Sequence, residues 1–498
     1  MNPARKIIAG SLLAIALLSA LLFWSPRTRM SEPTRRPLLV YCAAGLKGPM
    51  EAVARDYELR TGVPIQLQFG GSGLLLSNLR IARQGDLFLA ADNSFLDAAR
   101  SNGILAEIVP LARMTPVIAV PRGNPRSIIS LQDLGREGVQ IAFANPESTA
   151  IGRVARKALE QSGDWSAIQS RIKVLKPTVN DVANDVKLGT VDAGIVWDAT
   201  AAQYPELIPV RVPQLEGAVA DVGIGVLTSC DQPAAALRFA RYLGSRDRGL
   251  PEFTRAGFQV VPGDVWTEHP EVVLYSGGVN RIAIEDTVRQ FEQREGVSVT
   301  RVYNGCGILT AQIRAGQRPD AYFACDVSFM SNVAPHFLPS RELADTRLVI
   351  LTRPGNPKGL HSLKDLTQPG LSLGVAHEQQ SALGALTVSL LRSENLLSEV
   401  MPNVRVQSPT ADLLVNQLRA GSLDAVIVYS ANASAAKGIL DAVELPQPGA
   451  LAIQPFAVGR TSEHAQLMER LLDQLRSPAS RLRFQQAGFH WRDESPAP

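Results

Sequence analysis

The chain has 498 residues, of which 45% are hydrophobic and 19% are charged. This composition excludes an intrinsically disordered chain and a polytopic membrane protein, and the length predicts about three domains. The net charge of +3 does not indicate a nucleic-acid partner, because residues 1–37 hold six of the 50 Lys and Arg residues and one of the 47 acidic residues. The rest of the chain is close to neutral.

An apolar run spans residues 7–24 and has basic residues on both sides. Its 18 residues are just long enough to cross a bilayer as a helix, and neither a small-residue cleavage site nor a cysteine follows it. We therefore expect residues 1–37 to be an uncleaved signal anchor and tether, with a cleaved signal peptide as the alternative. Either alternative places the remaining chain on the periplasmic, extracytoplasmic side of the inner membrane. The signal anchor would also attach the protein to that membrane.

The chain contains an internal repeat. Residues 41–95 match residues 275–329 without a gap, and further matches follow at a slightly shorter offset, such as GNP at 123–125 with GNP at 355–357. A period this long indicates a duplicated globular unit and excludes a solenoid. We predict two tandem copies, residues 38–263 and 270–491, the second partly degenerate. The short joint predicts that they are close neighbours.

Each copy shows alternating strands and helices. In copy one, strands are expected at residues 38–41, 63–69, 87–90, 116–120, 139–143 and 193–197. A helix is expected over residues 50–57, ended by Gly62, and another after the sequence GGSG at 70–73. This α/β alternation predicts parallel sheets with ligands near the carboxyl ends of the strands.

Three of the expected strand-to-helix loops in copy one are rich in small residues: 42–45, 70–73 and 145–152. Glycines let the backbone approach a ligand, and the following helix N-terminus offers unpaired N–H groups with a positive partial charge. Each loop alone is also a common structural turn, but the three together favour a cradle of neutral donors for an oxyanion. The loop at 70–73 lacks the Lys of a P-loop and the third glycine of a dinucleotide fingerprint.

Catalytic groupings are poorly supported. Of six histidines, only His377 falls in a candidate loop, and its counterpart in copy one is Asn145. We therefore expect no enzyme, no metal site and no cofactor. Asp86 and Asp92, like their counterparts in copy two, are expected to be structural. The four cysteines lack metal-binding spacing, so buried free thiols are favoured, with a single Cys306–Cys325 bridge as the alternative.

Several segments of copy one resemble the periplasmic molybdate-binding proteins of ABC importers. They read LLVYCAAGL, YELRTGVPIQLQFGGSG, GDLFLAADNSFLD, IAFANPESTAIGRVARKAL and LGTVDAGIVWDA, and copy two matches more loosely. The resemblance implies the type II periplasmic binding fold, in which two α/β lobes close around a tetrahedral oxyanion. Its ligand-contacting places fall on Gly45, Ser72, Gly73, Ile151, Val179 and Trp197 in copy one, and on Val279, Cys306, Leu383, Ala411 and Tyr429 in copy two.

Three of these positions depart from the family pattern. Gly45 stands where a hydroxyl donor is usual, Trp197 where a tyrosine is usual, and Cys306 replaces the serine of the small-residue loop. Ile151 and Val179 would contribute backbone N–H groups. The resemblance implies binding of molybdate or tungstate for delivery to an ABC permease, and the alternative is a membrane-anchored oxyanion sensor or scaffold that is not coupled to transport.

Overall fold

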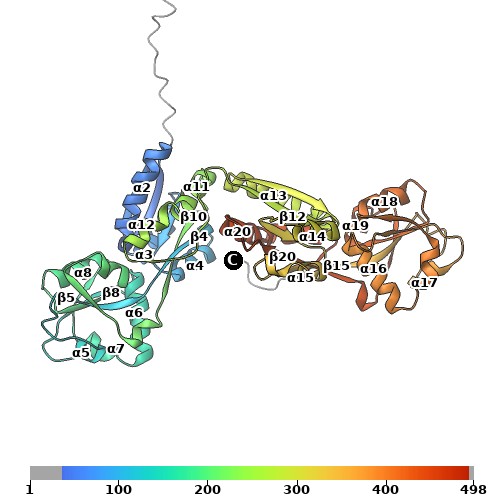
Figure 1. Cartoon of the computed structure of the whole chain (residues 1–498). Helices are drawn as coiled ribbons and strands as arrows, with labels where there is room; N and C mark the ends of the chain where they lie inside the picture. Colours follow the sequence, from blue (N-terminus) through green and yellow to red (C-terminus); the bar gives the residue numbers. More distant parts are fainter. Residues whose placement is uncertain (1–35, 493–498) are drawn as a thin grey trace, which may run out of the picture.

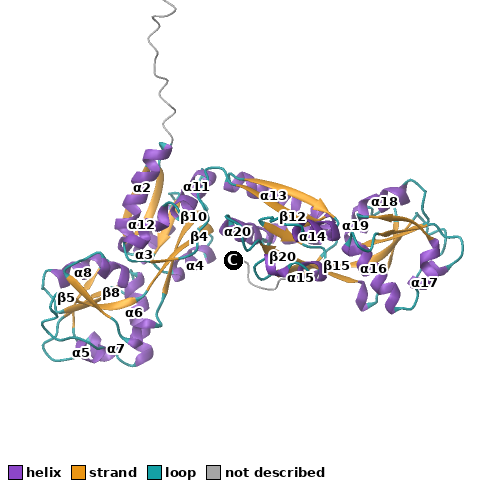
Figure 2. Ribbon diagram, in the orientation of Figure 1, coloured by secondary structure: helices purple, strands orange, loops and turns teal. Residues whose placement is uncertain are grey.

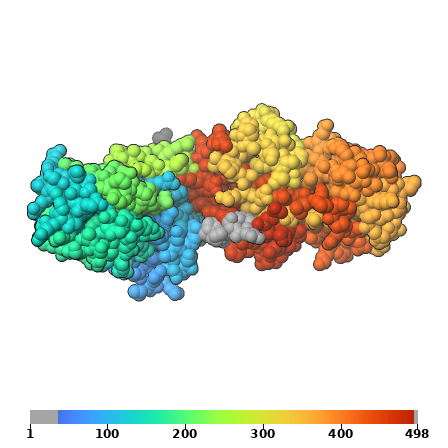
Figure 3. All heavy atoms as spheres, turned by 90° about the horizontal axis from the view of Figure 1, so that it is seen from below, coloured from blue at the N-terminus to red at the C-terminus, as the bar shows by residue number. Residues whose placement is uncertain are grey.

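The computed structural model describes residues 36–492, so the predicted membrane anchor lies outside the described residues. Within the described part, no helix is both long and apolar enough to cross a bilayer. Figures 1 and 3 show an elongated molecule in which copy one and copy two lie end to end, each divided into two lobes. The lobes at the centre of the molecule are called the inner lobes, and those at its two ends the outer lobes.

The inner lobe of copy one is built on a six-stranded sheet in the order β11-β4-β10-β3-β1-β2. Its strands are β1 (Leu38–Ala43), β2 (Ile65–Gly70), β3 (Leu87–Ala90), β4 (Leu105–Met114), β10 (Ala220–Leu227) and β11 (Gln259–Val260). Its helices are η1 (Ala44–Leu46), α2 (Lys47–Thr61), α3 (Ser72–Ala82), α4 (Asn93–Ser101), α11 (Pro233–Leu243) and α12 (Gly249–Arg255).

The outer lobe of copy one has a five-stranded sheet in the order β7-β6-β8-β5-β9, with helices around it (Figure 2). Its strands are β5 (Pro116–Pro121), β6 (Ile141–Ala144), β7 (Ile172–Lys176), β8 (Ala193–Trp197) and β9 (Leu207–Val210). Its helices are α5 (Leu131–Leu134), α6 (Ala150–Ser162), α7 (Trp165–Gln169), α8 (Val179–Lys187), α9 (Asp198–Ala202) and α10 (Pro213–Glu216).

Copy two repeats this plan. Its inner lobe holds β12 (Glu271–Gly277), β13 (Ser298–Asn304), β14 (Ala321–Phe323), β20 (Leu451–Val458), β21 (His490–Trp491), η2 (Gly278–Asn280), α13 (Arg281–Glu295), α14 (Cys306–Arg314), α15 (Val327–Ser331), η3 (Ala334–His336), α20 (Ala465–Leu475) and α21 (Pro478–Gln486). Its outer lobe holds β16 (Leu373–Ala376), β17 (Val404–Ser408), β18 (Ala425–Tyr429), β19 (Asp441–Glu444), η4 (Leu363–Thr367), α16 (Ala382–Ser393), α17 (Leu397–Val400), η5 (Met401–Asn403), α18 (Ala411–Arg419), α19 (Ser430–Ala435) and η6 (Pro448–Ala450).

One strand, β15 (Arg341–Thr352), crosses between the lobes of copy two. It pairs with β20 in the inner lobe and with β18 and β19 in the outer lobe, which joins both sheets of the copy. Copy one interrupts the corresponding strand at Thr115, between β4 and β5, where the next residue is Pro116. Because proline has no N–H group, it cannot continue the ladder of hydrogen bonds at that point.

The predicted strands and helices are largely confirmed, and the expectation of parallel sheets holds for the core of each sheet but not for the strands added to it. Strands β2, β1 and β3 are parallel, and so are β7, β6 and β8. Strands β4, β10 and β11 extend the inner sheet in antiparallel fashion, and β5 and β9 do the same in the outer sheet. Four of these antiparallel strands, β4, β5, β9 and β10, flank the two crossings between the lobes, and β11 lies at the end of copy one.

The predicted structural role of the strand-flanking aspartates is confirmed. The Asp86 carboxylate accepts from the Leu39 N–H (2.9 Å), as the Asp320 carboxylate does from the Val273 N–H (2.8 Å). Asp92 caps helix α4 by accepting from the Ser94 N–H, and Asp326 caps α15 in the same way. These four carboxylates hold strands and helix ends in place.

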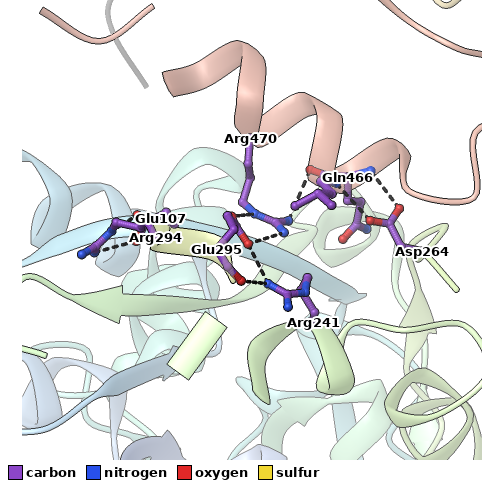
Figure 4. A network of polar contacts seen from close by, with 8 residues as sticks. Glu107, Arg241, Asp264, Arg294, Glu295, Gln466 and Arg470 are labelled. Atoms are coloured by element: carbon purple, nitrogen blue, oxygen red, sulfur yellow. Dashed lines mark hydrogen bonds and ion pairs between the residues drawn. The ribbon is translucent and has the colours of Figure 1, made fainter. Parts of the chain in front are cut away.

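The two copies meet through a buried cluster of charges. Glu295, the last residue of α13, is 1% exposed. It binds Arg470 of α20 (Nε to Oε1, 2.6 Å) and Arg241 of α11 in copy one (NH1 to Oε2, 2.9 Å). Figure 4 shows these side chains converging, with Arg294 and Glu107 forming a second pair between the copies beside them. We call Arg241, Glu295 and Arg470 the interface triad.

The linker between the copies is fixed by both of them. The Asp264 carboxylate accepts from the N–H groups of Gln466 (2.8 Å) and Leu467 (3.0 Å) at the N-terminus of α20. The Trp266 ring lies edge-on to the Tyr242 ring in copy one, with centroids 4.9 Å apart. These contacts confirm that the copies are close neighbours, held by more than the chain between them.

Candidate functional site

In copy one, a small cavity lies between the two lobes. It is formed where the parallel strands of both sheets end, and the loops after β1, β2, β3, β6, β7 and β8 all reach it. The lining residues are Ala43, Ala44, Gly45, Gly70, Gly71, Ser72, Ala91, Thr149, Ala150, Ile151, Thr178, Val179 and Trp197. None of these described lining residues carries a charged side chain.

Three helices of the α/β lobes begin at this cavity: α3, α6 and α8. The first N–H groups of a helix have no acceptor within the helix. In α6, the Thr149 side chain accepts from the Gly152 N–H (3.1 Å), and in α8 the Thr178 side chain accepts from the Asp181 N–H (3.2 Å). The N–H groups of Ile151 and Val179 precede these bonded positions. They are therefore donors that the helices leave for a bound group.

Ser72 places its hydroxyl in the cavity at the first turn of α3. It is 1% exposed, and its oxygen accepts from the Ala91 N–H at 3.2 Å. That bond occupies an acceptor position of the hydroxyl and fixes the side chain, while the hydroxyl hydrogen can point into the cavity. Ser72 is thus held as a donor by a backbone group of the neighbouring loop.

The two lobes of copy one touch beside the cavity. The Gly73 N–H donates to the Ser148 carbonyl of the outer lobe (3.0 Å), and the Asn180 side chain donates to the Ala44 carbonyl (3.0 Å). A Cβ at Gly71 would clash with the same Ser148 oxygen and lie 3.0 Å from the Pro177 carbonyl oxygen. Glycine at this position is what lets the lobes approach. Gly73 does not line the cavity; its N–H is used in the hydrogen bond to Ser148 that joins the two lobes.

Five of the six predicted places in copy one line this cavity, all except Gly73, and Gly45 lies beside Trp197. A Cβ at Gly45 would lie 3.0 Å from Cγ1 of Val179 and 3.6 Å from Cδ1 of Trp197. The space that a serine side chain would need is therefore partly taken by the Val179 methyl group. The departure at Gly45 fits the packing around it.

In copy two, an equivalent small cavity lies between the lobes. It is lined by Gly278, Val279, Asn304, Gly305, Cys325, Ser381, Leu383, Pro409, Thr410, Ala411, Asp412, Tyr429 and Asn432. Four of the five predicted places line it. Cys306 is fully buried directly behind Cys325, and the Cys325 N–H donates to its sulfur (3.1 Å).

The chemistry of the second cavity differs from that of the first. Asp412 brings a carboxylate, which is bonded to the Asn432 side chain (3.3 Å). The Tyr429 hydroxyl and the Asn432 carbonyl oxygen are buried, and neither has a hydrogen-bond partner among the described residues. Burial raises the pKa of Tyr429 well above its ordinary value, and the nearby Cys325 and Cys306 add to this. The hydroxyl therefore stays protonated and can act as a donor.

The sequence did not single out Thr200, Asp412 or Asn432, and it named Cys325 only as a possible disulfide partner of Cys306. The Thr200 hydroxyl is buried without a partner among the described residues and lies 3.5 Å from the Cβ position of Gly45. Its counterpart in the repeat is Asn432. Extending the alignment of the two copies past strands β8 and β18, into helices α9 and α19, could have found this pair.

The predicted buried free thiols are confirmed. Cys42, Cys230, Cys306 and Cys325 are all buried and unbridged. Burial raises the pKa of the Cys230 thiol to about 12, and a hydrogen bond to Asp86 adds to the shift. Among the described residues, no group of three or more His, Cys, Asp or Glu side chains is arranged to hold a metal ion.

Comparison with known proteins gives the same pattern of two units. The family model of bacterial extracellular solute-binding proteins matches residues 38–259 and again residues 272–490. The molybdate-binding protein ModA of Mycobacterium tuberculosis is 30% identical over 221 residues, which is 43% of this chain and 82% of that protein. A binding protein of Haemophilus influenzae is 28% identical over 222 residues, 44% of this chain and 90% of that protein.

Among solved structures, the periplasmic molybdate-binding protein of Azotobacter vinelandii matches with 21% identity and a TM-score of 0.40, covering 45% of this chain and 99% of that one. The sulfate-binding protein SubI of Mycobacterium tuberculosis matches with 17% identity and a TM-score of 0.39, covering 46% of this chain and 88% of that one. The two family-model segments take up most of the chain. The chain belongs to the bacterial extracellular solute-binding protein family and contains two tandem copies of its unit.

Proposed function

We propose that copy one binds a tetrahedral oxyanion, molybdate or tungstate, and delivers it to an ABC permease on the extracytoplasmic side of the membrane. The observation that carries this proposal is the cavity of copy one. Its donors are a fixed serine hydroxyl and helix N-termini from both lobes, and none of its lining side chains is charged. The 30% identity with a molybdate-binding protein supports the same solute.

Neutral donors suit an anion that carries no hydrogen of its own. Helix N-termini and hydroxyl groups stabilise negative charge, because their N–H and O–H dipoles point at the ligand. Molybdate, tungstate and sulfate present only acceptor oxygens near neutral pH, whereas phosphate retains an O–H group that needs an acceptor. The lining of copy one contains no carboxylate that could accept it. We therefore expect copy one to discriminate against phosphate.

Calorimetric titration of the purified protein with molybdate, tungstate, sulfate and phosphate tests this proposal. Ser72→Ala should weaken binding by roughly tenfold to a hundredfold, because an unpaired buried group costs about 1–3 kcal/mol. Ser77→Ala is the matched control, since the Ser77 hydroxyl lies on the same helix and bonds only to the Gly73 carbonyl (2.9 Å). Absence of heat with all four anions would overturn the proposal.

A second comparison locates the site. We expect Ser72→Ala to reduce affinity more than Cys306→Ala, because copy one keeps the serine hydroxyl and copy two has a thiol, which is a weaker donor. Equal losses from the two variants would show that the assignment to copy one is wrong.

Delivery and location are tested separately. We propose that residues 1–37 hold the protein at the outer face of the cytoplasmic membrane, where a permease can receive the solute. Cell fractionation with mass determination of the mature N-terminus checks the anchor. Uptake of labelled molybdate by cells with and without the gene checks the transport role, and binding without any effect on uptake would favour a sensor.

A further inference from the structure

Copy two places two cysteines where copy one has its serine and an alanine. At an offset of 234 residues, Ser72 corresponds to Cys306 and Ala91 corresponds to Cys325. The two sulfur atoms lie 2.7 Å apart, and neither cysteine is bridged. The hydrogen bond that fixes the serine in copy one is repeated, since the Cys325 N–H donates to the Cys306 sulfur at 3.1 Å.

A third position shows that the surrounding backbone is adapted to this pair. Gly277 ends β12 where copy one has Ala43. A Cβ at Gly277 would overlap the Cys325 sulfur and would lie 3.0 Å from the Cys306 sulfur. Two larger side chains therefore occur together with the loss of the one methyl group that would collide with them. If the two thiols were buried there by chance, no accompanying change from alanine to glycine at position 277 would be expected.

The pair differs from the other two cysteines in its access to small molecules. Cys325 lines the cavity of copy two, and Cys306 lies behind it. Burial raises the pKa of Cys306, but hydrogen bonds from Cys325 and Tyr322 outweigh it and hold the pKa below its ordinary value. The contact with Cys306 and burial raise the pKa of Cys325, so the proton of the pair lies on Cys325. Cys42 and Cys230 line neither cavity, and burial raises the pKa of each. Thiolate character and access together decide which thiol reacts.

We propose that Cys306 and Cys325 form a reversible disulfide at the base of the second cleft, made by exchange with a small disulfide that enters the cavity. The Cys325 thiol passes its proton to the Cys306 thiolate, 2.7 Å away, and its sulfur attacks one sulfur of the small disulfide, whose first half leaves as a thiolate. Cys306 then gives this proton to the released thiolate and attacks Cys325 in the mixed disulfide, which releases the second half. The protein loses two electrons and the proton of the pair, the small disulfide takes them up, and its second half takes a proton from water to become the second thiol.

The disulfide changes the chemistry of the second cleft without locking its lobes together. Cys306 begins α14 and Cys325 follows β14, so both belong to the inner lobe. Oxidation removes the S–H hydrogen at the place where copy one presents the Ser72 hydroxyl. The oxidised cleft therefore lacks a side-chain donor at this helix N-terminus, whereas the reduced cleft retains a weak one.

Thiol counting on the purified full-length protein tests the proposal, whatever solute the protein binds. The reduced, folded protein is incubated with oxidised glutathione, unfolded, alkylated and analysed by peptide mass spectrometry. We expect two of the four thiols to be lost, a linked pair of peptides containing Cys306 and Cys325, and recovery of all four thiols with dithiothreitol. Four alkylated thiols, or a bridge through Cys42 or Cys230, would overturn the proposal.

Variants give a second readout. Cys306→Ser should stop the reaction at a glutathione adduct on Cys325, because the resolving thiol is missing. The double variant Cys306→Ser with Cys325→Ala reproduces the residues of copy one and should keep both of its remaining thiols. A Cys306→Ser protein without the adduct would contradict the order of attack. The wild-type count still decides the proposal if a variant fails to fold, and a failure to bind oxyanions would leave it unaffected.

Discussion

The interface triad leads to a quantitative prediction for Glu295→Gln. This change removes one negative charge and leaves the guanidinium groups of Arg241 and Arg470 facing each other in a buried site, where both side chains are 7% exposed. Removing one partner of a buried ion pair costs about 3–5 kcal/mol, because the remaining charge is left uncompensated. The amide keeps one acceptor oxygen, so we expect a loss near the lower limit, about 3 kcal/mol.

A second ion pair between the copies provides the matched control. Arg246 of copy one and Glu463 of copy two are 3.5 Å apart, and their side chains are 51% and 68% exposed. Exposed pairs contribute about 0–1 kcal/mol, because water and salt screen them. Glu463→Gln therefore removes the same charge at the same junction with little expected effect. A difference between the two variants isolates the effect of burial.

Urea denaturation monitored by circular dichroism measures the free energy of unfolding of both variants. Because the triad lies between the copies, Glu295→Gln should also separate their unfolding into two transitions, whereas Glu463→Gln should unfold like the wild type. A loss of less than about 1 kcal/mol for Glu295→Gln, equal to that of Glu463→Gln, would refute the reasoning.

The same carboxylate predicts a pH dependence. Burial raises the pKa of Glu295, but Arg470 and Arg241 outweigh it and hold the pKa below its ordinary value of 4.5. A carboxylate with a lowered pKa in the folded protein stabilises it fully above the ordinary value, and this stabilisation is lost as the pH falls through the folded value. The difference in stability between wild type and Glu295→Gln should therefore be constant near neutral pH and shrink below pH 4.5. A difference that grows on acidification would contradict this assignment.

Three further substitutions test the clefts. Gly71→Ala should weaken oxyanion binding at least about tenfold, because its Cβ would collide with a carbonyl of the opposite lobe and keep the cleft open. Titration calorimetry measures this loss. The control is Gly217→Ala, whose Cβ meets no atom within 4 Å. Tyr429→Phe should leave the melting temperature unchanged or raise it, because the lost hydroxyl is buried without a partner among the described residues; a clear decrease in calorimetry would show that the hydroxyl is satisfied. Gly277→Ala should destabilise the protein by about 1–3 kcal/mol through overpacking, and Cys325→Ala should rescue it; a destabilisation that Cys325→Ala leaves unchanged would show that the sulfur is not what Gly277 accommodates.

The parallel core of each lobe could be predicted from the sequence. The strands at 87–90 and 193–197 are short apolar runs between turn residues, and the structure places β3 and β8 on those residues. Gly62 was predicted to end a helix, and it does so with a φ of 69°, a conformation that glycine adopts without strain. Local pattern was sufficient there because periodicity, glycine and burial all indicate the same element.

The antiparallel extensions could not be predicted in the same way. Strand β4 contains Pro110 in its middle, and proline normally argues against a strand that is paired on both sides. The structure accommodates it at a register shift in the pairing of β4 with β10, opposite Gly223. That pairing joins residues more than 100 positions apart, so no local pattern reports it.

The interface triad was equally hidden. Glu295 ends a helix whose other charged residues are exposed or half-buried, and neither its spacing nor its neighbours distinguish it. Only the arrival of Arg241 from copy one and Arg470 from a helix near the C-terminus makes it the centre of a buried network (Figure 4). The short joint predicted that the copies are close neighbours, and the chemistry of their contact follows from tertiary structure alone.

The repeat has a different value at the two clefts, because it supplies an internal control for each position. If copy two had simply lost its binding function, a missing donor such as the serine replaced by Cys306 would be expected. Coordinated changes at several neighbouring positions would not be expected. The sulfur pair occurs with a glycine that makes room for it, and the Tyr429 hydroxyl stays buried without a partner although an unpaired buried group costs about 1–3 kcal/mol. In a cleft without a function, no selection would maintain such a destabilising group. The second cleft is therefore better explained as a site with its own chemistry than as a degenerate copy of the first.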